Sequence, residues 1–370
     1  MMMELPEDVL EEILCRVPAT SLKRLRCICK QWNSLFTDKR FARKHFRKAP
    51  RQSLILMLKN LGFSSMSFNL HRVSPIEIIG ELNLIDPHSS SYLFKIYQSY
   101  HSSDGLLLCV CVDNKMDDTR LVVWNPCTGQ TKWIQQINRY MPSYTFATGS
   151  YQDNKSGNKS YKILSRRSYG EPEFEIYEID SNSWRILDVN VDCNVMYIGN
   201  VTLKGKTYWF ARDKKDLRVY WSAPLFLICF DYTTERFERL CLPYPYPYHG
   251  YRNKSLSVVR EEKLSVLLQR TITSKTEIWV TNKIGETKVL SWIKVLTVDL
   301  KPELRDGIKF LVDEEKKFLV CIQNNGYKSQ TMVYFFGEDK KVREVAFGDE
   351  FKPFLLNYVP SLTQIQQGDD

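Results

Sequence analysis

The first fifty residues space their apolar side chains as short amphipathic helices do. A first stripe ends near Pro18, where proline stops a helix. Its members are Leu5, Val9, Leu10, Ile13, Leu14 and Val17. A second stripe comprises Leu22, Leu25, Ile28, Trp32 and Leu35, and a further helix is indicated by Phe41, His45 and Phe46. The pattern therefore predicts three short helices.

Helices this short bury little apolar surface among themselves. Either the stripes pack on one another and on the domain that follows, or part of the apolar surface is kept for a partner helix. The pattern alone leaves both explanations open.

From about residue 52 the helical spacing gives way to short β-branched and aromatic runs separated by polar turns. Five of these runs form strand–turn–strand segments that repeat along the chain. When the segments are aligned, they step by 53, 52, 50 and 55 residues. The positions on which they align are Trp124, Tyr177, Cys229, Trp279 and Tyr334.

Further strands precede each segment, which gives about four strands per unit, the pattern of a kelch-like β-propeller. Residues 53–84 form a candidate degenerate blade, and the late run 355–365 is placed to close the ring by adding a strand to it. We therefore predict an all-β propeller of about six blades over residues 52–365, followed by a polar tail at 366–370. A two-sheet sandwich is the alternative, although it requires no period of this length.

The 370 residues are 43% apolar and 26% charged, as in a globular protein with a large core. No apolar run is long enough to predict a membrane span, and the acidic start MMMELPEDV is unlike a signal peptide. We therefore expect a cytoplasmic or nuclear protein without a membrane partner. Its ten cysteines are expected to be reduced thiols.

The net charge of +9 is uneven, because Arg16 to Arg51 hold twelve Lys or Arg residues and one acid, Asp38. A basic block of this kind favours an acidic partner, either nucleic acid or an acidic protein surface. A solvated helical face explains it equally well.

Residues 5–18 read L-P-x-x-x-L-x-x-I-L-x-R-V-P, and residues 21–32 read S-L-x-R-x-R-x-x-C-K-x-W. Over about forty residues without a gap, this segment resembles an F-box. The resemblance implies a domain at residues 1–48 that docks a Skp-type adaptor and, through it, the cullin and RING protein of an SCF ubiquitin ligase. Adaptors of this kind are acidic, which would suit the basic block.

The same resemblance places eight residues in or beside the adaptor contact. They are Leu5, Pro6, Ile13, Leu14, Val17, Pro18, Leu22 and Trp32. Leu10, Leu25 and Ile28 are expected to hold the helices together instead.

The β segment contains DGLLLC at Asp104, VVWNPCTGQTKWI at Val122, FEIYEIDSNSWRIL at Phe174 and YVPSL at Tyr358. These runs resemble a plant F-box-associated domain, type 1, and the resemblance covers most of residues 95–365. Ser103 stands where the family often has a cysteine, a departure that bears on packing alone. The resemblance implies a protein–protein interaction domain and no catalysis.

The sequence contains no motif typical of catalysis, nucleotide binding or metal binding. Its five histidines lack metal-ligand spacing, and its paired acids read as solvated turn residues. We therefore expect no catalytic residue, no metal and no cofactor. Six tryptophans recur with the repeats and are predicted to fill the core between blades. They are Trp124, Trp133, Trp184, Trp209, Trp279 and Trp292.

Residues 243–251, PYPYPYHGY, alternate proline and tyrosine, which favours an extended loop. The loop joins the last strand of one repeat to the first strand of the next, and in a propeller all such loops emerge on one face. Tyrosine suits an interface because it combines contact area with a hydrogen-bonding tip, although these side chains would also serve to cover neighbouring blades. The candidate target-binding residues are Tyr140, Tyr197, Tyr244, Tyr246, Tyr248 and Tyr251.

The resulting hypothesis is a substrate-recognition subunit of an SCF-type ubiquitin ligase, whose F-box docks the adaptor and whose β domain binds an unidentified target protein. The alternatives are a scaffold that binds the adaptor without delivering a target, a propeller enzyme, and a nucleic-acid binder. The missing acid–base cluster counts against an enzyme. Against nucleic acid, the basic residues alternate with an apolar stripe and have no stacking platform beside them.

Overall fold

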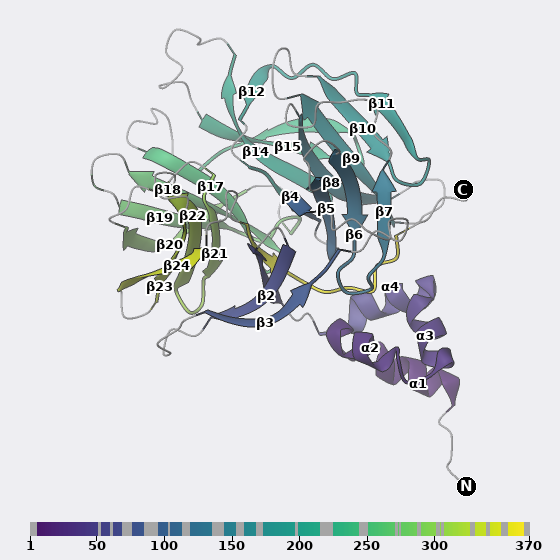
Figure 1. The fold of residues 1–370 in the computed structure, drawn as a ribbon. Helices are drawn as coiled ribbons and strands as arrows, with labels where there is room; N and C mark the ends of the chain where they lie inside the picture. The colour runs from purple at the N-terminus through teal and green to yellow at the C-terminus, as the bar shows by residue number, and fades with distance from the viewer. Residues whose placement is uncertain are drawn as a thin grey trace.

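Four helices open the chain in the computed structural model, and strands follow them (Figure 1). The helices are α1 (Glu7–Leu14), α2 (Ala19–Leu25), α3 (Lys30–Thr37) and α4 (Lys39–Lys48). The structure describes residues 6–50, 53–59, 62–68, 76–84, 95–102, 104–112, 119–134, 144–152, 159–167, 173–196, 199–214, 225–243, 251–270, 273, 275–286, 290–300, 304, 307–325, 330–337, 341–348 and 354–365.

The second predicted helix is in fact two helices, so the expectation of three helices was wrong. α2 ends at Leu25, and the chain turns before Cys29, whose backbone is extended at φ −152° and ψ 159°. The sulfur of Cys29 accepts a hydrogen bond from the backbone N–H of Trp32 at 3.5 Å and so caps α3. The carboxylate of Asp38 caps α4 in the same way, at 2.8 Å from the nitrogen of Phe41.

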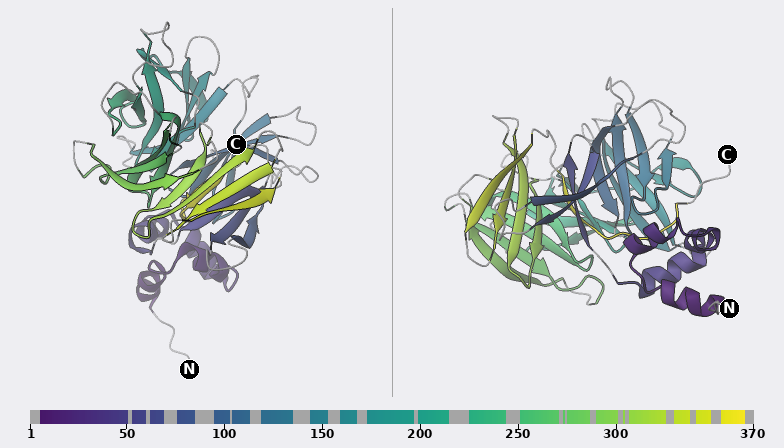
Figure 2. Two further views of the ribbon diagram at one scale, coloured as in Figure 1. Left: turned by 90° about the vertical axis from the view of Figure 1, so that its left-hand side faces the viewer. Right: turned by 60° about the horizontal axis from the view of Figure 1, so that its bottom comes forward.

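The strands form six sheets arranged as the blades of a β-propeller (Figure 1, Figure 2). Blade 1 contains β25 (Leu355–Tyr358), β1 (Leu54–Lys59), β2 (Gly62–Phe68) and β3 (Ile76–Leu82). Blade 2 contains β4 (Lys95–Ser102), β5 (Leu106–Val112), β6 (Thr119–Trp124) and β7 (Thr131–Ile134). Blade 3 contains β8 (Tyr144–Gln152), β9 (Lys159–Arg167), β10 (Phe174–Glu178) and β11 (Ser183–Ile186).

The remaining three blades follow in chain order. Blade 4 contains β12 (Cys193–Val195), β13 (Val201–Leu203), β14 (Lys206–Asp213), β15 (Leu225–Asp231) and β16 (Arg236–Leu240). Blade 5 contains β17 (Tyr251–Val259), β18 (Lys263–Arg270), β19 (Lys275–Thr281) and β20 (Trp292–Asp299). Blade 6 contains β21 (Lys309–Asp313), β22 (Phe318–Asn325), β23 (Gln330–Phe336) and β24 (Val342–Gly348). Six separate sheets exclude the two-sheet sandwich.

β25 joins the two ends of the β domain, as the sequence predicted. It pairs antiparallel with β1, and the register places Leu54 opposite Tyr358 and Met57 opposite Leu355. Blade 1 is thus built from both ends of the domain, which closes the ring. The predictions of six blades and of a closing strand are confirmed.

The fifty-residue repeat corresponds to one blade, because its five alignment positions all lie in the third strand counted outward along the paired order of a blade, which in blade 4 runs β12-β14-β15-β16. Each of the six apolar clusters of the β domain joins two neighbouring blades. The six tryptophans pack in these clusters, as predicted. Trp124 and Trp209 are buried and the other four are half-buried.

Strand direction gives the propeller two distinct faces. The innermost strands, such as β17 and β25, contact their neighbours around the centre of the ring. We call the face where these strands begin the entry face, and the face where they end the exit face. The β4–β5 turn, the β6–β7 turn and the segment after β25 lie on the exit face, next to the helices (Figure 1).

Candidate functional site

The four helices, here called the helical module, share an apolar core with the propeller. Two of its buried members come from the propeller side: Cys127 lies in the β6–β7 turn and Leu362 follows β25. Within the module, the rings of Phe36 and Phe41 pack at a centroid distance of 5.6 Å. The other buried members are Leu14, Cys15, Ala19, Leu22 and Ala42. The core therefore spans the junction between the module and the propeller.

α1 carries two apolar faces, which appear in the sequence as a single stripe. Leu10 and Leu14 face the core, and Leu14 is only 4% exposed. Val9 and Ile13, four residues apart on the other face, are 41% and 48% exposed. Val9 and Ile13 thus form an exposed apolar pair on α1.

The predicted adaptor-contact residues divide between surface and core. Leu14 and Leu22 are 4% and 0% exposed, so they lie beneath the surface and offer no area to a partner in this arrangement. Leu5 lies outside the described residues. The exposed or half-buried members of the set are Pro6, Ile13, Val17, Pro18 and Trp32.

Ile28 was predicted to hold the helices together, and that prediction is wrong because its side chain is 62% exposed. It lies in the turn between α2 and α3, between the exposed Cys27 and Cys29. Sequence reasoning missed Val9 and Ile28 as surface residues. The four-residue spacing of Val9 and Ile13 was the available signal for Val9, whereas the exposure of Ile28 follows from the helix break.

A hollow of about 860 Å³ lies between α1 and the helices α3 and α4. Its apolar lining comes from Leu10, Trp32 and Leu35. Polar and charged side chains complete the lining, and they are Glu7, Asp8, Glu11, Gln31, Ser34, Arg40 and Lys44. Most of the lining is therefore polar or charged.

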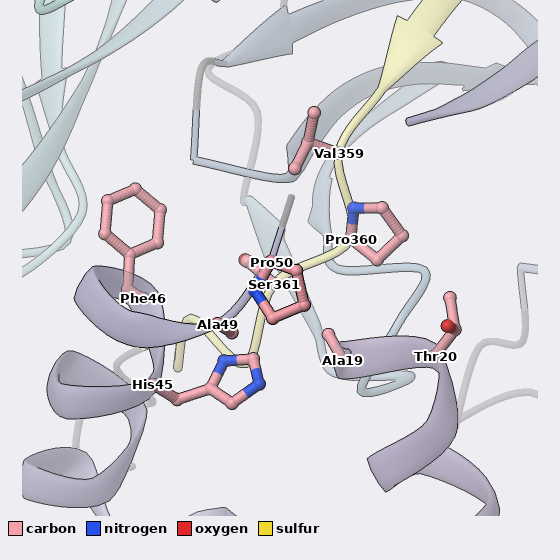
Figure 3. A pocket seen from close by; sticks show the side chains of 9 residues that line it. All are labelled: Ala19, Thr20, His45, Phe46, Ala49, Pro50, Val359, Pro360 and Ser361. Carbon is pink, nitrogen blue, oxygen red and sulfur yellow. The ribbon is translucent and has the colours of Figure 1, made fainter. Parts of the chain in front are cut away.

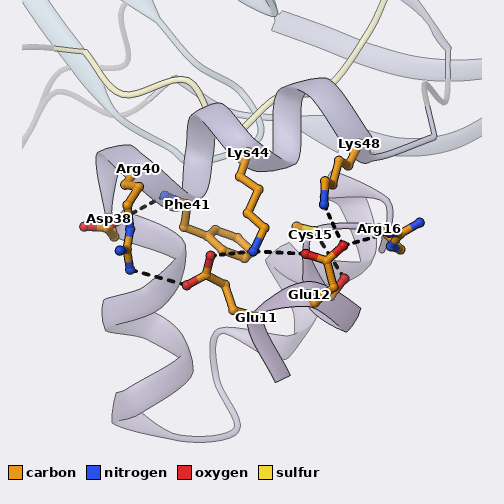
Figure 4. Close-up of polar contacts among 9 residues, drawn as sticks. All are labelled: Glu11, Glu12, Cys15, Arg16, Asp38, Arg40, Phe41, Lys44 and Lys48. Atoms are coloured by element: carbon orange, nitrogen blue, oxygen red, sulfur yellow. Dashed lines mark hydrogen bonds and ion pairs between the residues drawn. The ribbon is translucent and has the colours of Figure 1, made fainter. Parts of the chain in front are cut away.

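Ion pairs tie α1 to α4 (Figure 4). The Nζ atom of Lys44 lies 2.8 Å from the carboxylate of Glu11 and 3.1 Å from that of Glu12. Lys48 and Arg16 approach the carboxylate of Glu12 to 2.6 and 2.7 Å. Hydrogen bonds from Lys48, Arg16 and Lys44 stabilise the ionised carboxylate and lower the pKa of Glu12 to about 2.

Many side chains of the basic block are engaged in contacts within the chain. Besides the ion pairs with α1, Lys23 donates to the carbonyl of Pro126 at 3.0 Å, and Arg26 donates to the carbonyl of Thr128 at 3.2 Å. Such residues serve the fold, so the positive charge that a nucleic acid would meet is smaller than the sequence suggested. Exposed basic side chains of the module include Arg24, Lys30, Lys39 and Arg47.

The predicted target-binding tyrosines fall almost entirely outside the described residues. This applies to Tyr140, Tyr197, Tyr244, Tyr246 and Tyr248. Tyr251 is described by its backbone alone, as the first residue of β17. Because innermost strands begin on the entry face, the start of β17 lies on the side of the propeller opposite the helical module.

Seven of the ten cysteines are buried, and Cys109 is one of them. Burial raises the pKa of the Cys109 thiol to about 12, and a hydrogen bond to Ser99 offsets only part of that effect. A thiol of this kind is protonated at neutral pH and is not a nucleophile. Over the described ranges, no three His, Cys, Asp or Glu side chains gather as metal ligands would. Each described helix also falls short of the length and apolarity that crossing a bilayer demands.

Comparison with known families assigns both parts of the chain. A model described as F-box domain matches residues 2–44, and a model described as F-box associated beta propeller domain matches residues 54–365. This chain belongs to the F-box proteins. The helical module is its F-box, and the six blades are its F-box-associated propeller.

Full-length relatives of this F-box protein are found in Arabidopsis thaliana. A putative F-box protein is 67% identical over 100% of both chains. An F-box/kelch-repeat protein is 47% identical, over 98% of this chain and 96% of its own. The F-box protein ETP2 is 46% identical over the same shares. The order of F-box and propeller is therefore shared along the whole length of these proteins.

Proposed function

We propose that this F-box protein is the substrate-recognition subunit of an SCF-type ubiquitin ligase. In this function the F-box docks a Skp-type adaptor, which connects it to a cullin and a RING protein. The propeller binds a target protein for ubiquitination. The chain carries out no bond chemistry and acts by tethering, which raises the effective concentration of target lysines near the charged enzyme.

The observation that supports this proposal best is the uncovered apolar surface of α1. Val9 and Ile13 point away from the core, and the hollow lined by Trp32 and Leu35 opens along the face of the same helix that carries Glu7, Leu10 and Glu11. α1 is the helix on the side of the module away from the propeller (Figure 1). The F-box thus uses one side to pack on its own propeller and keeps the other for a partner.

The exposed basic side chains Arg24, Lys30, Lys39 and Arg47 of the F-box would favour an acidic adaptor. The charged side chains that line the hollow beside α1 are mixed, with Glu7, Asp8 and Glu11 facing Arg40 and Lys44, so a partner there needs charges of both signs. Because Leu14 and Leu22 are buried, we assign them to support this surface from beneath. Val9 and Ile13 provide the direct contact.

The test is co-purification of the full chain with a Skp-type adaptor and cullin. Ile13→Asp is expected to abolish binding, since a charge in an apolar contact remains unpaired. The matched control is Ile293→Asp, because Ile293 is 66% exposed on β20, far from the F-box in the chain. Failure of the intact protein to bind, or equal binding by both variants, would overturn the proposal.

The target side requires a separate test. We assign target binding to the entry face and to the tyrosines predicted from the sequence. Replacing Tyr244, Tyr246 and Tyr248 together with Ser is expected to reduce capture of target proteins and to leave adaptor binding intact. Unchanged capture would show that the Pro-Tyr loop only covers neighbouring blades.

A further inference from the structure

The segment that follows β25 crosses the junction between the propeller and the F-box. It comprises residues 359–365, which we call the C-terminal strap. In Figure 1 it runs as a yellow trace beneath blade 2 and above the helices. β25 itself is held in blade 1 by pairing with β1, so the strap begins at a fixed point.

Polar contacts fasten the strap to the exit face of blade 2. The side-chain amide of Asn125 donates to the carbonyl of Ser361 at 3.1 Å and to the carbonyl of Thr363 at 2.8 Å. The hydroxyls of Ser361 and Thr363 both donate to the carbonyl of Asp104, at 2.5 and 3.1 Å. Two turns of the same blade therefore hold both sides of the strap.

The strap enters the F-box at two points. Leu362 is 2% exposed and packs in the core that contains Leu22, Phe36 and Phe41. The side-chain amide of Gln364 donates to the carbonyl of Phe36 at 3.4 Å, and it accepts from Gln130 of the propeller at 2.6 Å. A single side chain thus joins the end of α3 to the β6–β7 turn.

A small pocket lies at this junction (Figure 3). The cavity there measures about 20 Å³ and is lined by α4 residues such as His45 and Phe46 and by strap residues Val359, Pro360 and Ser361. Such a volume is close to the minimum for one water molecule. The two domains therefore meet in a packed interface and are not joined only by the chain between α4 and β1.

We propose that the C-terminal strap is a positioning element that sets the orientation of the F-box on the propeller and completes the F-box core with Leu362. The adaptor-binding side of α1 and the entry face of the propeller are then held in one fixed relation. That consequence rests on the proposed function. The positioning itself does not, because it follows from contacts within this chain.

The test measures orientation and core stability in the full chain without any partner. Cys27 in the F-box and Cys241 after β16 are both exposed, so they accept spin labels once Cys29→Ser removes the third exposed thiol. Serine is a good N-cap and preserves the start of α3. Distance distributions between the labels report orientation, and amide hydrogen exchange of α2–α4 reports the core.

Leu362→Ala is expected to broaden the distance distribution and to speed exchange in α2–α4 by about tenfold or more, because truncating a buried leucine removes packing that the helices need. Leu362→Met should restore both readouts, since it keeps the volume. Leu304→Ala is the matched control, because Leu304 is 1% exposed in the cluster between blades 5 and 6. Leu304→Ala should leave the amide exchange of α2–α4 and the label distances as they are in the unmodified chain.

Unchanged exchange and distances in Leu362→Ala would overturn the proposal, and so would an equal effect of Leu304→Ala. Faster exchange with an unbroadened distance would overturn the positioning role. If Leu362→Ala does not fold, Gln364→Ala decides, because it removes the bond to Phe36 and keeps the buried leucine. It is expected to broaden the distances while the strands keep their protection. If the unmodified chain does not bind the adaptor, the proposed function is refuted. The label distances and the amide exchange still decide the positioning role, because they are measured without a partner.

Discussion

The side-chain amide of Gln364 donates a hydrogen bond to the carbonyl oxygen of Phe36, 328 residues earlier in the chain. Phe36 lies near the end of α3, one of the F-box helices, and Gln364 follows the strand that closes the propeller. The first and last parts of the described chain therefore share one packed interface. Stability and orientation of the F-box depend on residues that belong to the other domain.

Truncation of Leu22 is expected to destabilise the F-box far more than truncation of Ile28. Leu22→Ala should lower the free energy of unfolding of the F-box by about 2–5 kcal/mol, because it leaves a cavity in a buried core. Ile28→Ala should change it by no more than about 0.5 kcal/mol, since that side chain is mostly in solvent. Denaturant unfolding followed by helical signal measures both. Similar losses in the two variants would contradict the burial described here.

Glu12 is expected to make the F-box sensitive to acid. Its pKa is about 2 in the folded chain and 4.5 by default, so its contribution to stability is complete above about pH 4.5 and is lost as the pH falls toward 2. Glu12→Gln should flatten the fall of the melting temperature across that interval. It should also reduce the effect of added salt, because the pairs with Lys44 and Lys48 are partly exposed.

The control for this prediction is Glu81→Gln, which changes an exposed carboxylate on β3. It should retain the acid profile of the unmodified chain. A profile for Glu12→Gln that coincides with the unmodified one would show that the pairs between α1 and α4 do not stabilise the fold.

His45 is expected to weaken the junction at mildly acidic pH. Burial lowers its pKa below the ordinary 6.5, while the hydrogen bond from its Nε2 to the carbonyl of Val17, at 2.7 Å, opposes part of that change. Since the unfolded chain takes up this proton more readily, stability is complete above pH 6.5 and falls below it. Among the described residues that line the cavity, no other side chain is charged.

His45→Gln tests this expectation, because it keeps a hydrogen-bond donor and removes the titration. Amide exchange in α4, measured from pH 7.5 to 5.5 and corrected for intrinsic rates, should rise in the unmodified chain and stay level in the variant. A parallel rise in both would assign the effect to another group.

Gly149 is expected to be essential for packing between blades 3 and 4. A side-chain methyl group at position 149 would overlap the ring of Tyr232. A methyl group at position 80 would lie 3.6 Å from the hydroxyl of Ser65, which is an ordinary van der Waals contact. Tyr232 is fully buried and its hydroxyl bonds Thr207 at 3.0 Å, so it has nowhere to move. Gly149→Ala should lower stability by about 1–3 kcal/mol, and Gly80→Ala should lower it little. Thermal unfolding of both variants decides the point.

Much of the fold was predictable because the propeller repeats itself. The spacing from Trp124 to Tyr334 gave the blade length, and a lone strand-like run after residue 354 matched a first blade that lacked one strand. Both signals are local patterns of apolar and polar residues, which a single sequence contains.

The surface of the F-box was less predictable for a physical reason. Which side of α1 is covered depends on how the later helices pack on it, as in the ion pairs of Glu11 and Glu12 with Lys44 and Lys48 of α4. The helix pattern shows that Val9, Leu10, Ile13 and Leu14 are apolar, yet it does not show what packs on them. The break at Ile28 also depends on the capping contact made by Cys29.

The pairing of β1 with β25 also affects the order in which parts of the chain can fold during synthesis. The F-box helices and β1 leave the ribosome before β25 and Leu362. β1 therefore cannot pair with β25, and the F-box core cannot be completed, until the end of the described chain has been made. Until the last blade has emerged, the apolar sides of these early segments face solvent and are open to chaperones. These early segments are thus among the last parts of the described chain to reach their native packing.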